Sequence, residues 1–193
     1  MTETVYFIAG ASRGIGLEFV KQLVKRPGAV VFAGVRSPSS LESQFPSGPT
    51  NLRILKCDVT SDHDVSACVD AVARSVYKRI DVLINNAGID NFLPIRRTSP
   101  EQLQLVLETN LVAPLRIMKA FIPLLEQSPV KKVICMSSDF GSIAMNDRKE
   151  FGAYNVSKAG LNQLVIQFKN EYAEEGITFI PMHPGYVFTH FVG

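Results

Sequence analysis

The feature that most constrains this chain is the alternation of short apolar runs, rich in β-branched residues, with longer segments of helical periodicity. Strands that are apolar on both faces are typical of a parallel sheet with helices on both sides. The pattern therefore predicts a doubly wound α/β fold. The apolar runs span residues 4–9, 29–35, 52–57, 80–84, 130–136 and 177–182. The helical patterns lie at residues 14–26, 62–78, 100–126 and 153–174.

Length and composition are those of an ordinary globular protein. The chain has 193 residues, of which 46% are hydrophobic and 20% charged, so residues 1–193 are expected to form a single domain with a sizeable core. A net charge of +2 without a long basic run gives little support to nucleic acid or a membrane surface as the partner. No apolar run could span a bilayer, and the first residues lack the basic start and cleavage site of a signal peptide.

The cysteines and histidines show no metal-binding pattern. Cys57, Cys68 and Cys135 are odd in number and lack the paired spacing of metal ligands. We expect them to be reduced thiols in a cytoplasmic protein. No cluster of His, Cys, Asp and Glu has metal-ligand spacing either, so the sequence predicts no metal site.

A glycine-rich segment, GASRGIG at residues 10–16, connects the first predicted strand to the first predicted helix. Glycines allow a tight turn and a close approach of the backbone to a phosphate, and the following helix N-terminus offers free N–H groups. Glycines also make ordinary turns. The position between a strand and a helix favours a pyrophosphate site, with GxxxGxG spacing instead of GxGxxG.

The end of the second predicted strand bears on the choice of dinucleotide. An acidic residue there would bind the ribose 2′-hydroxyl of NAD, whereas an arginine suits the 2′-phosphate of NADP. The strand ends with Gly34-Val35-Arg36 and has no acid. Arg36 and the loop residue Arg13 could clamp the phosphate together. Either arginine alone is more simply a solvated surface charge, but the pair favours NADP(H).

Other polar motifs also follow predicted strands. Asp58 follows the third, although it could simply cap the next helix, and residues 85–88 (NNAG) follow the fourth, although they could form an ordinary turn. Residues 137–138 end the fifth, and residues 184–185 follow the sixth. The carboxyl ends of parallel strands form the ligand-binding edge of open α/β sheets. Their shared position is stronger evidence for a site than any single motif.

Tyr154 and Lys158 lie four residues apart and therefore share one face of the last predicted helix. A surface tyrosine stacked on a lysine stem is the simpler interpretation. However, this face continues into the apolar stripe of Leu161, Val165 and Phe168, where a lysine is costly unless it serves a site. An ammonium beside a phenol is expected to lower its pKa from about 10 towards neutrality. Tyr154 is thus a candidate general acid or base for a carbonyl–alcohol pair.

Along its whole length the chain resembles the short-chain dehydrogenases/reductases. The motifs occur in that family's order: GxxxGxG at 10–16, Asp58, NNAG at 85–88, Asn110, Ser138, Tyr154-x-x-x-Lys158 and Pro184-Gly185. It is most similar to the C-factor/sniffer group of carbonyl reductases through residues 110–115 and 137–144. The resemblance implies a Rossmann-like parallel sheet with strand order 3-2-1-4-5-6. It also implies NADPH-dependent reduction of a ketone, diketone or aldehyde to an alcohol.

The resemblance implies roles for individual residues. Tyr154 would protonate the substrate carbonyl oxygen while the nicotinamide delivers hydride to the carbon, and Ser138, the second serine of its pair, would hydrogen-bond that oxygen. Lys158 would hold the nicotinamide ribose, and Asn110 would support a water chain that restores the proton. The expected cofactor contacts are Gly10, Ser12, Arg13, Gly14, Ile15, Gly16, Arg36, Asp58, Val59, Asn86, Ala87, Gly88, Tyr154, Lys158, Pro184, Gly185, Val187 and Thr189.

Two departures from the family pattern carry expectations of their own. Ala9 replaces the usual threonine before the first glycine, so one hydroxyl that supports the NNAG turn is expected to be missing. The sequence also stops at Gly193, where relatives continue with a substrate-covering segment, a helix and a last strand. We expect an open sheet edge and substrate pocket. The alternative function is a non-catalytic or weakly active NADP(H)-binding sensor or scaffold.

Substrate and assembly are less constrained. Specificity is expected from Asp139, Phe140 and the loop at 146–152, which leaves the small-molecule carbonyl substrate unnamed. The apolar faces of the helices at 100–126 and 153–174 could form a homodimer, as in many relatives, or pack against their own sheet.

Overall fold

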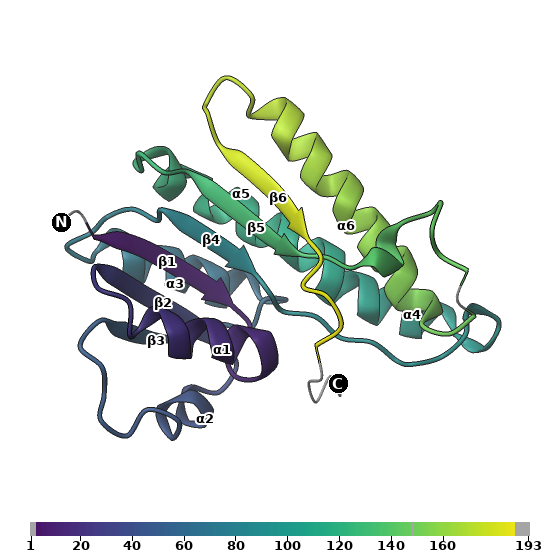
Figure 1. Cartoon of the computed structure of the whole chain (residues 1–193), viewed down its shortest axis with the longest axis horizontal. Helices are drawn as coiled ribbons and strands as arrows, with labels where there is room; N and C mark the ends of the chain where they lie inside the picture. The colour runs from purple at the N-terminus through teal and green to yellow at the C-terminus, as the bar shows by residue number, and fades with distance from the viewer. Residues whose placement is uncertain (1–2, 148, 188–193) are drawn as a thin grey trace.

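The computed structural model describes residues 3–147 and 149–187. Within them, six parallel strands form one sheet in the order β3-β2-β1-β4-β5-β6 (Figure 1), which confirms the predicted fold class and strand order. The edges of this sheet are β3 and β6. The strands are β1 (Thr4–Ala9), β2 (Ala29–Val35), β3 (Leu52–Lys56), β4 (Val82–Asn85), β5 (Lys132–Met136) and β6 (Thr178–Met182).

Helices cover both faces of the sheet and create two apolar cores. One core packs α3, α5 and α6 against the side chains of Val5 and Phe7, and the other packs α1 and α2 against Tyr6 and Ile8. Alternate β1 residues thus point into different cores, as expected for a strand buried on both sides. The α-helices are α1 (Gly14–Leu23), α2 (Pro38–Glu42), α3 (Asp62–Ala73), α4 (Pro100–Leu107), α5 (Ala113–Glu126) and α6 (Gly152–Glu171). Short 3-10 turns are η1 (Ile95–Arg97) and η3 (Asp139–Gly141).

The single helix predicted over residues 100–126 is wrong. A π-helical turn, η2 (Glu108–Val112), separates α4 from α5. A regular α-helix would need the N–H of residue 114 to donate to the carbonyl of Asn110, but Pro114 has no N–H. The wider turn also directs the Asn110 side chain inward, where it is fully buried.

Most other differences from the sequence prediction concern element ends. Three helices predicted at 14–26, 62–78 and 153–174 end earlier, because the chain must reverse before the next strand. Two of the three reversals use positive φ values at Gly28 (75°) and Gly176 (70°), which glycine adopts without steric cost. The predicted strand boundaries differ from the observed ones by two residues at most.

No helix in the described ranges is long and apolar enough to cross a membrane. Cys57, Cys68 and Cys135 are buried and form no disulfide, as predicted. Among the described residues, no group of His, Cys, Asp and Glu is placed to hold a metal ion.

Candidate active site and cofactor cleft

The glycine loop between β1 and α1 is held by main-chain hydrogen bonds. The N–H groups of Gly10 and Ala11 donate to the carbonyl of Gly34 at 3.0 and 3.1 Å. Gly10 has a φ of +84°, and a Cβ there would lie 2.7 Å from the main chain of Ala87. Only glycine fits such a position. The loop therefore lies directly against the turn that follows β4.

The first turn of α1 is suited to an anion. The helix begins at Gly14 after Arg13, whose side chain makes no capping hydrogen bond, and its first turn holds no acidic residue. A helix N-terminus of this kind presents free N–H groups and the positive end of the helix dipole. Ser12 and Ile15 are half-buried beside it, and Gly16 is buried. This cradle fits the pyrophosphate of a dinucleotide.

Arg36 lies next to the glycine loop, because the loop N–H groups bond to the end of β2. Arg13 and Arg36 are both exposed. Neither forms an ion pair within residues 3–147 and 149–187. Both guanidinium groups are therefore available to a phosphate at the loop.

Asp58 and the buried Val59 follow β3 at the same edge. The N–H and hydroxyl of Thr60 donate to Asp58 at 2.9 and 2.7 Å. These bonds, together with the charge of Arg36, lower the pKa of Asp58 below its usual value. Helix α3 is capped by Ser61 instead. The alternative that Asp58 caps this helix is therefore wrong.

The turn after β4 is a structural partner of the glycine loop. The N–H groups of Asn86 and Ala87 donate to the carbonyl of Ala9 at 3.1 and 3.0 Å, and Asn86 Nδ2 donates to the carbonyl of Gly10 at 2.7 Å. Gly88 follows half-buried. The glycine loop and this turn are thus bonded to each other at the carboxyl ends of β1 and β4.

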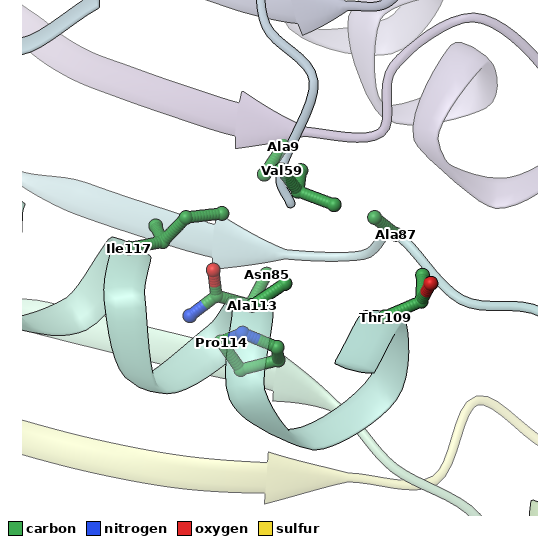
Figure 2. A pocket seen from close by; sticks show the side chains of 8 residues that line it. All are labelled: Ala9, Val59, Asn85, Ala87, Thr109, Ala113, Pro114 and Ile117. Carbon is green, nitrogen blue, oxygen red and sulfur yellow. The ribbon is translucent and has the colours of Figure 1, made fainter. Parts of the chain in front are cut away.

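A narrow crevice lies beside the glycine loop and the turn after β4 (Figure 2). Ala9 and Asn85 are paired across β1 and β4, and Asn85 Oδ1 is buried without a hydrogen-bond partner in the described part of the chain. Position 9, where the hydroxyl of the usual threonine is missing, thus lies beside the amide oxygen that has no hydrogen-bond partner. The lining residues are Ala9, Val59, Asn85, Ala87, Thr109, Ala113, Pro114 and Ile117.

Asn110 bridges β4, η2 and α6. Its Oδ1 accepts from the N–H of Ile89 at 2.9 Å, and its Nδ2 donates to the carbonyl of Ile89 at 2.8 Å and to Ser157 Oγ at 3.0 Å. Ser157 Oγ donates in turn to the carbonyl of Tyr154 at 2.7 Å. The bridge fixes the segment after β4 relative to the helical turn that carries Tyr154.

The two serines after β5 have different partners. Ser138 Oγ lies 3.1 Å from Asp139 Oδ1 and makes a hydrogen bond with the phenol of Tyr154. Ser137 Oγ donates to Asn162 Oδ1 at 2.6 Å. The structure therefore brings Ser138 to Tyr154, whereas Ser137 ties β5 to α6.

Tyr154 and Lys158 lie on the inner face of α6. Lys158 is 4% exposed, and its Nζ lies 5.3 Å from the centroid of the Tyr154 ring. The same Nζ donates to the carbonyl of Met136 at 2.6 Å. Burial lowers the pKa of Lys158 to about 8. The simpler interpretation, a surface tyrosine on a lysine stem, is therefore wrong.

The expected lowering of the Tyr154 pKa is also wrong. Burial, with smaller contributions from the negative charges of Asp90 and Asp139, raises the pKa of Tyr154 to about 12 against the opposing effect of the hydrogen bond with Ser138. The ammonium of Lys158 faces the ring and the carbonyl of Met136. Its charge therefore does not offset the cost of forming a buried phenolate.

The residues expected to line the nicotinamide follow β6. Pro184, Gly185 and Val187 are exposed, and Gly185 has a φ of +80°. Thr189 lies outside the described residues. The structure thus places three of these four residues at the same edge of the sheet as the glycine loop.

Comparison with known proteins decides the family. The family model for short chain dehydrogenases matches residues 4–193. The chain belongs to this family. An uncharacterized oxidoreductase of Schizosaccharomyces pombe is 38% identical over 192 residues, covering 97% of this chain and 75% of that protein. The short-chain dehydrogenase/reductase iacC of Pestalotiopsis fici is 34% identical over 201 residues, covering 95% and 74%.

Solved structures of short-chain dehydrogenases are also similar. The NADPH-bound carbonyl reductase from chicken fatty liver superposes with a TM-score of 0.91 at 31% identity, covering 100% of this chain and 80% of that one. The carbonyl reductase Sniffer of D. melanogaster gives a TM-score of 0.89 at 28% identity, covering 98% and 83%. The chain is therefore an oxidoreductase of the short-chain dehydrogenase family, with carbonyl reductases among its structural neighbours.

Sequence reasoning missed two polar residues that support the site of this short-chain dehydrogenase. Ser157 joins Asn110 to the Tyr154 carbonyl, and Asn162 holds Ser137. Both lie on the helix that carries Tyr154 and Lys158, and Ser157 is completely buried. A polar residue on an otherwise apolar helix face was the available signal.

A row of three phenylalanines extends from the ring of Tyr154. Phe140 packs edge-on to Tyr154 with ring centroids 6.0 Å apart, Phe151 lies 5.2 Å from Phe140, and Phe92 lies 5.8 Å from Phe151. We call these four residues the aromatic wall. Phe140 and Phe151, the latter in the loop at 146–152, were expected near the site, whereas Phe92 was not, because no local motif reveals that its loop approaches the others.

Proposed function

We propose that this short-chain dehydrogenase is an NADPH-dependent carbonyl reductase that converts a ketone, diketone or aldehyde into an alcohol. The observation that carries the proposal is the burial of Lys158 directly beside Tyr154. A buried lysine without a carboxylate partner destabilises the fold. A catalytic role for Lys158 would explain why such a costly residue is present here. The NADPH-bound carbonyl reductase with the same fold supports the cofactor and the reaction class.

The cofactor would lie along the carboxyl edge of the sheet. The N-terminus of α1 would bind its pyrophosphate, and Arg13 with Arg36 would bind the 2′-phosphate. Asp58 and Val59 would contact the adenine, and Asn86 and Ala87 the adjoining ribose. Lys158 would bind the nicotinamide ribose, and the segment after β6 would line the nicotinamide.

In the proposed mechanism, Tyr154 and Ser138 bind the carbonyl oxygen of the substrate. When bound, NADPH supplies the hydride that forms the new C–H bond, and it is left as NADP⁺. Tyr154 transfers its phenolic proton to the oxygen, which forms the O–H bond of the alcohol. The raised pKa of Tyr154, about 12, keeps the phenol protonated until the developing alkoxide accepts the proton. Asn110 positions Tyr154 through Ser157, and solvent restores the phenol proton.

The reaction is tested by NADPH oxidation with a panel of diketones, ketones and aldehydes. We expect the wild type to oxidise NADPH and Tyr154→Phe to lose most of the rate, about a hundredfold or more. Tyr172→Phe, at the residue that directly follows α6 and outside the site, is the matched control. Equal rates for Tyr154→Phe and the wild type would overturn the mechanism. NADPH binding without turnover of any carbonyl would favour the sensor or scaffold function.

The cofactor preference is tested separately at Arg36. Arg36→Asp removes a phosphate ligand and adds a repulsive charge, so it should weaken NADPH binding about tenfold or more relative to NADH. Arg26→Asp, an exposed arginine past the far end of α1, is the matched control. An unchanged preference for NADPH, measured by calorimetry, would show that Arg36 is only a surface charge.

A further inference from the structure

The buried carboxylate of Asp90 is a feature that the proposed mechanism leaves without a role. Asp90 is the second residue after the turn that follows β4, and only 7% of it is exposed. Within residues 3–147 and 149–187, no side chain and no well-aligned N–H group bonds to its carboxylate oxygens, although the N–H groups of Asn91 and Phe92 lie near them. Buried carboxylates are costly unless they are paired and hydrogen-bonded, so an unsatisfied one is unusual outside a functional site.

The backbone holds Asp90 firmly in this place. Asn110 bonds to both the N–H and the carbonyl of Ile89, the residue just before it. Two residues later, Phe92 adopts a φ of +54° and packs its ring on Phe151 of the aromatic wall. The short segment that carries Asp90 is therefore fixed on one side by Asn110 and on the other by the wall around Tyr154.

The charge of Asp90 acts on the reacting group. It is one of the two negative charges that raise the pKa of Tyr154, the other being Asp139. Burial in turn raises the pKa of Asp90 itself, and the N–H groups of Asn91 and Phe92 lower it only in part. Asp90 thus lies close enough to the phenol for the two groups to influence each other's protonation.

No cation of the described chain pairs with Asp90. Lys158, the buried lysine of the site, donates to the carbonyl of Met136, and none of the described ion pairs includes Asp90. The faces of the aromatic wall carry the negative part of the ring quadrupole, which also attracts cations. Phe92 of the wall follows Asp90 by only two residues, so the carboxylate and the ring of Phe92 lie on one short segment and together favour a positively charged, partly apolar ligand.

We propose that Asp90 binds a protonated amine of the substrate, so that the preferred substrates are amino ketones whose apolar part packs on the aromatic wall. This inference rests on the proposed carbonyl reductase function and adds the substrate class. An ammonium would supply the hydrogen bonds that both Asp90 oxygens lack. Its positive charge would also offset the field that disfavours the Tyr154 phenolate, so the substrate would assist its own protonation.

The test uses three ketones that differ in one group only: phenacylamine with an ammonium, phenacyl alcohol with a hydroxyl, and propiophenone with a methyl. The wild type with NADPH should show a kcat/KM for phenacylamine about tenfold or more above that for propiophenone, with phenacyl alcohol between them. Asp90→Asn, which keeps the shape and removes the charge, should reduce this ratio about tenfold. Asp70→Asn, an exposed carboxylate of α3, should leave the ratio unchanged.

Two outcomes would overturn the inference: no preference for phenacylamine in the wild type, or a preference that survives in Asp90→Asn. If Asp90→Asn does not fold, Asp90→Ser provides the same comparison. Calorimetric binding of the three ketones to the NADPH complex of Tyr154→Phe separates the two proposals. A preference for phenacylamine without turnover in the wild type would support the Asp90 site and contradict the reductase function. Turnover of the three ketones without a preference for phenacylamine would support the reductase function and contradict the Asp90 site.

Discussion

The two halves of the sheet hold their functional groups in opposite ways. Around β1 and β2, the glycine loop is fixed by main-chain bonds to the Gly34 carbonyl and by the Asn86 side chain, which donates to the Gly10 carbonyl, and close packing excludes side chains. Around β4, β5 and α6, buried polar side chains join separate elements, with Asn110 and Lys158 as the central members. The first arrangement presents the N-terminus of α1 to an anion, and the second positions the phenol of Tyr154, the proposed proton donor.

Because the two halves are held together differently, amino-acid substitutions in them should have different effects. In the glycine loop, a substitution that adds a Cβ should destabilise the fold, because the new atom would overlap backbone that cannot move away. The catalytic half should lose chemistry without losing the fold, because its charged groups destabilise the folded state. Variants in each half therefore test whether this division holds.

The largest expected effect is loss of activity in Lys158→Met. Carbonyl reduction should fall about a thousandfold, while the free energy of unfolding at neutral pH stays the same or rises. The buried ammonium costs on the order of 3 kcal/mol below its folded pKa, and loss of the bond to the Met136 carbonyl offsets part of that gain. Urea unfolding and NADPH oxidation are the measurements, with Lys169→Met on the exposed side of α6 as control.

The same variant tests the pKa of Lys158. Between about 8 and 10.5, the unfolded chain binds the lysine proton and the folded chain does not, so the wild type gains stability as pH rises. This gain should appear in the difference between the wild type and Lys158→Met, because other titrating groups cancel. A pH-independent difference would show that Lys158 remains fully charged in the folded protein.

The next effect is steric. In Gly16→Ala, the new Cβ would overlap the carbonyl oxygen of Gly10 and lie 2.6 Å from Asn86 Nδ2. We expect a loss of about 3 kcal/mol in stability and much weaker NADPH binding, measured by urea unfolding and calorimetry. Gly48→Ala is the control, since its Cβ meets nothing within 4 Å and its φ of +55° carries the only strain. Similar losses in both variants would contradict close packing as the cause.

The smallest expected effect concerns the crevice beside the glycine loop. Ala9→Thr supplies a hydroxyl beside the unpaired Asn85 Oδ1 and should make the protein about 1 kcal/mol more stable than Ala9→Val, which has the same shape without the hydroxyl. Thermal unfolding of the two variants measures this difference. If the valine variant is the more stable one, the hydroxyl does not reach Asn85.

The comparison also explains what the sequence could predict. The fold class, the strand order and the position of the glycine loop follow from local patterns, because apolar runs and glycine spacing are read over a few residues. The break at Glu108–Val112 was missed, although Asn110 and Pro114 both signal it. The helical periodicity on both sides of this break favoured one continuous helix over residues 100–126.

The catalytic half was predicted in part. Tyr154, Lys158 and Ser138 come together as expected, but the direction of the Tyr154 pKa was wrong, because burial and the charge of Asp90 depend on contacts between distant segments. The aromatic wall likewise joins residues 92, 140, 151 and 154. Such contacts have no local sequence signature, so the field around a reacting group follows only from the tertiary structure.

The most direct test of the central claim, that Tyr154 holds the proton used in reduction, is an alkaline ultraviolet titration of the wild type and Tyr154→Phe. The difference between the two isolates Tyr154 from the other four of the five tyrosines. With a pKa of about 12, Tyr154 should contribute no tyrosinate absorbance below about pH 10. Half of the difference signal appearing near neutral pH would show that Tyr154 is already a phenolate there and would contradict its role as the proton donor.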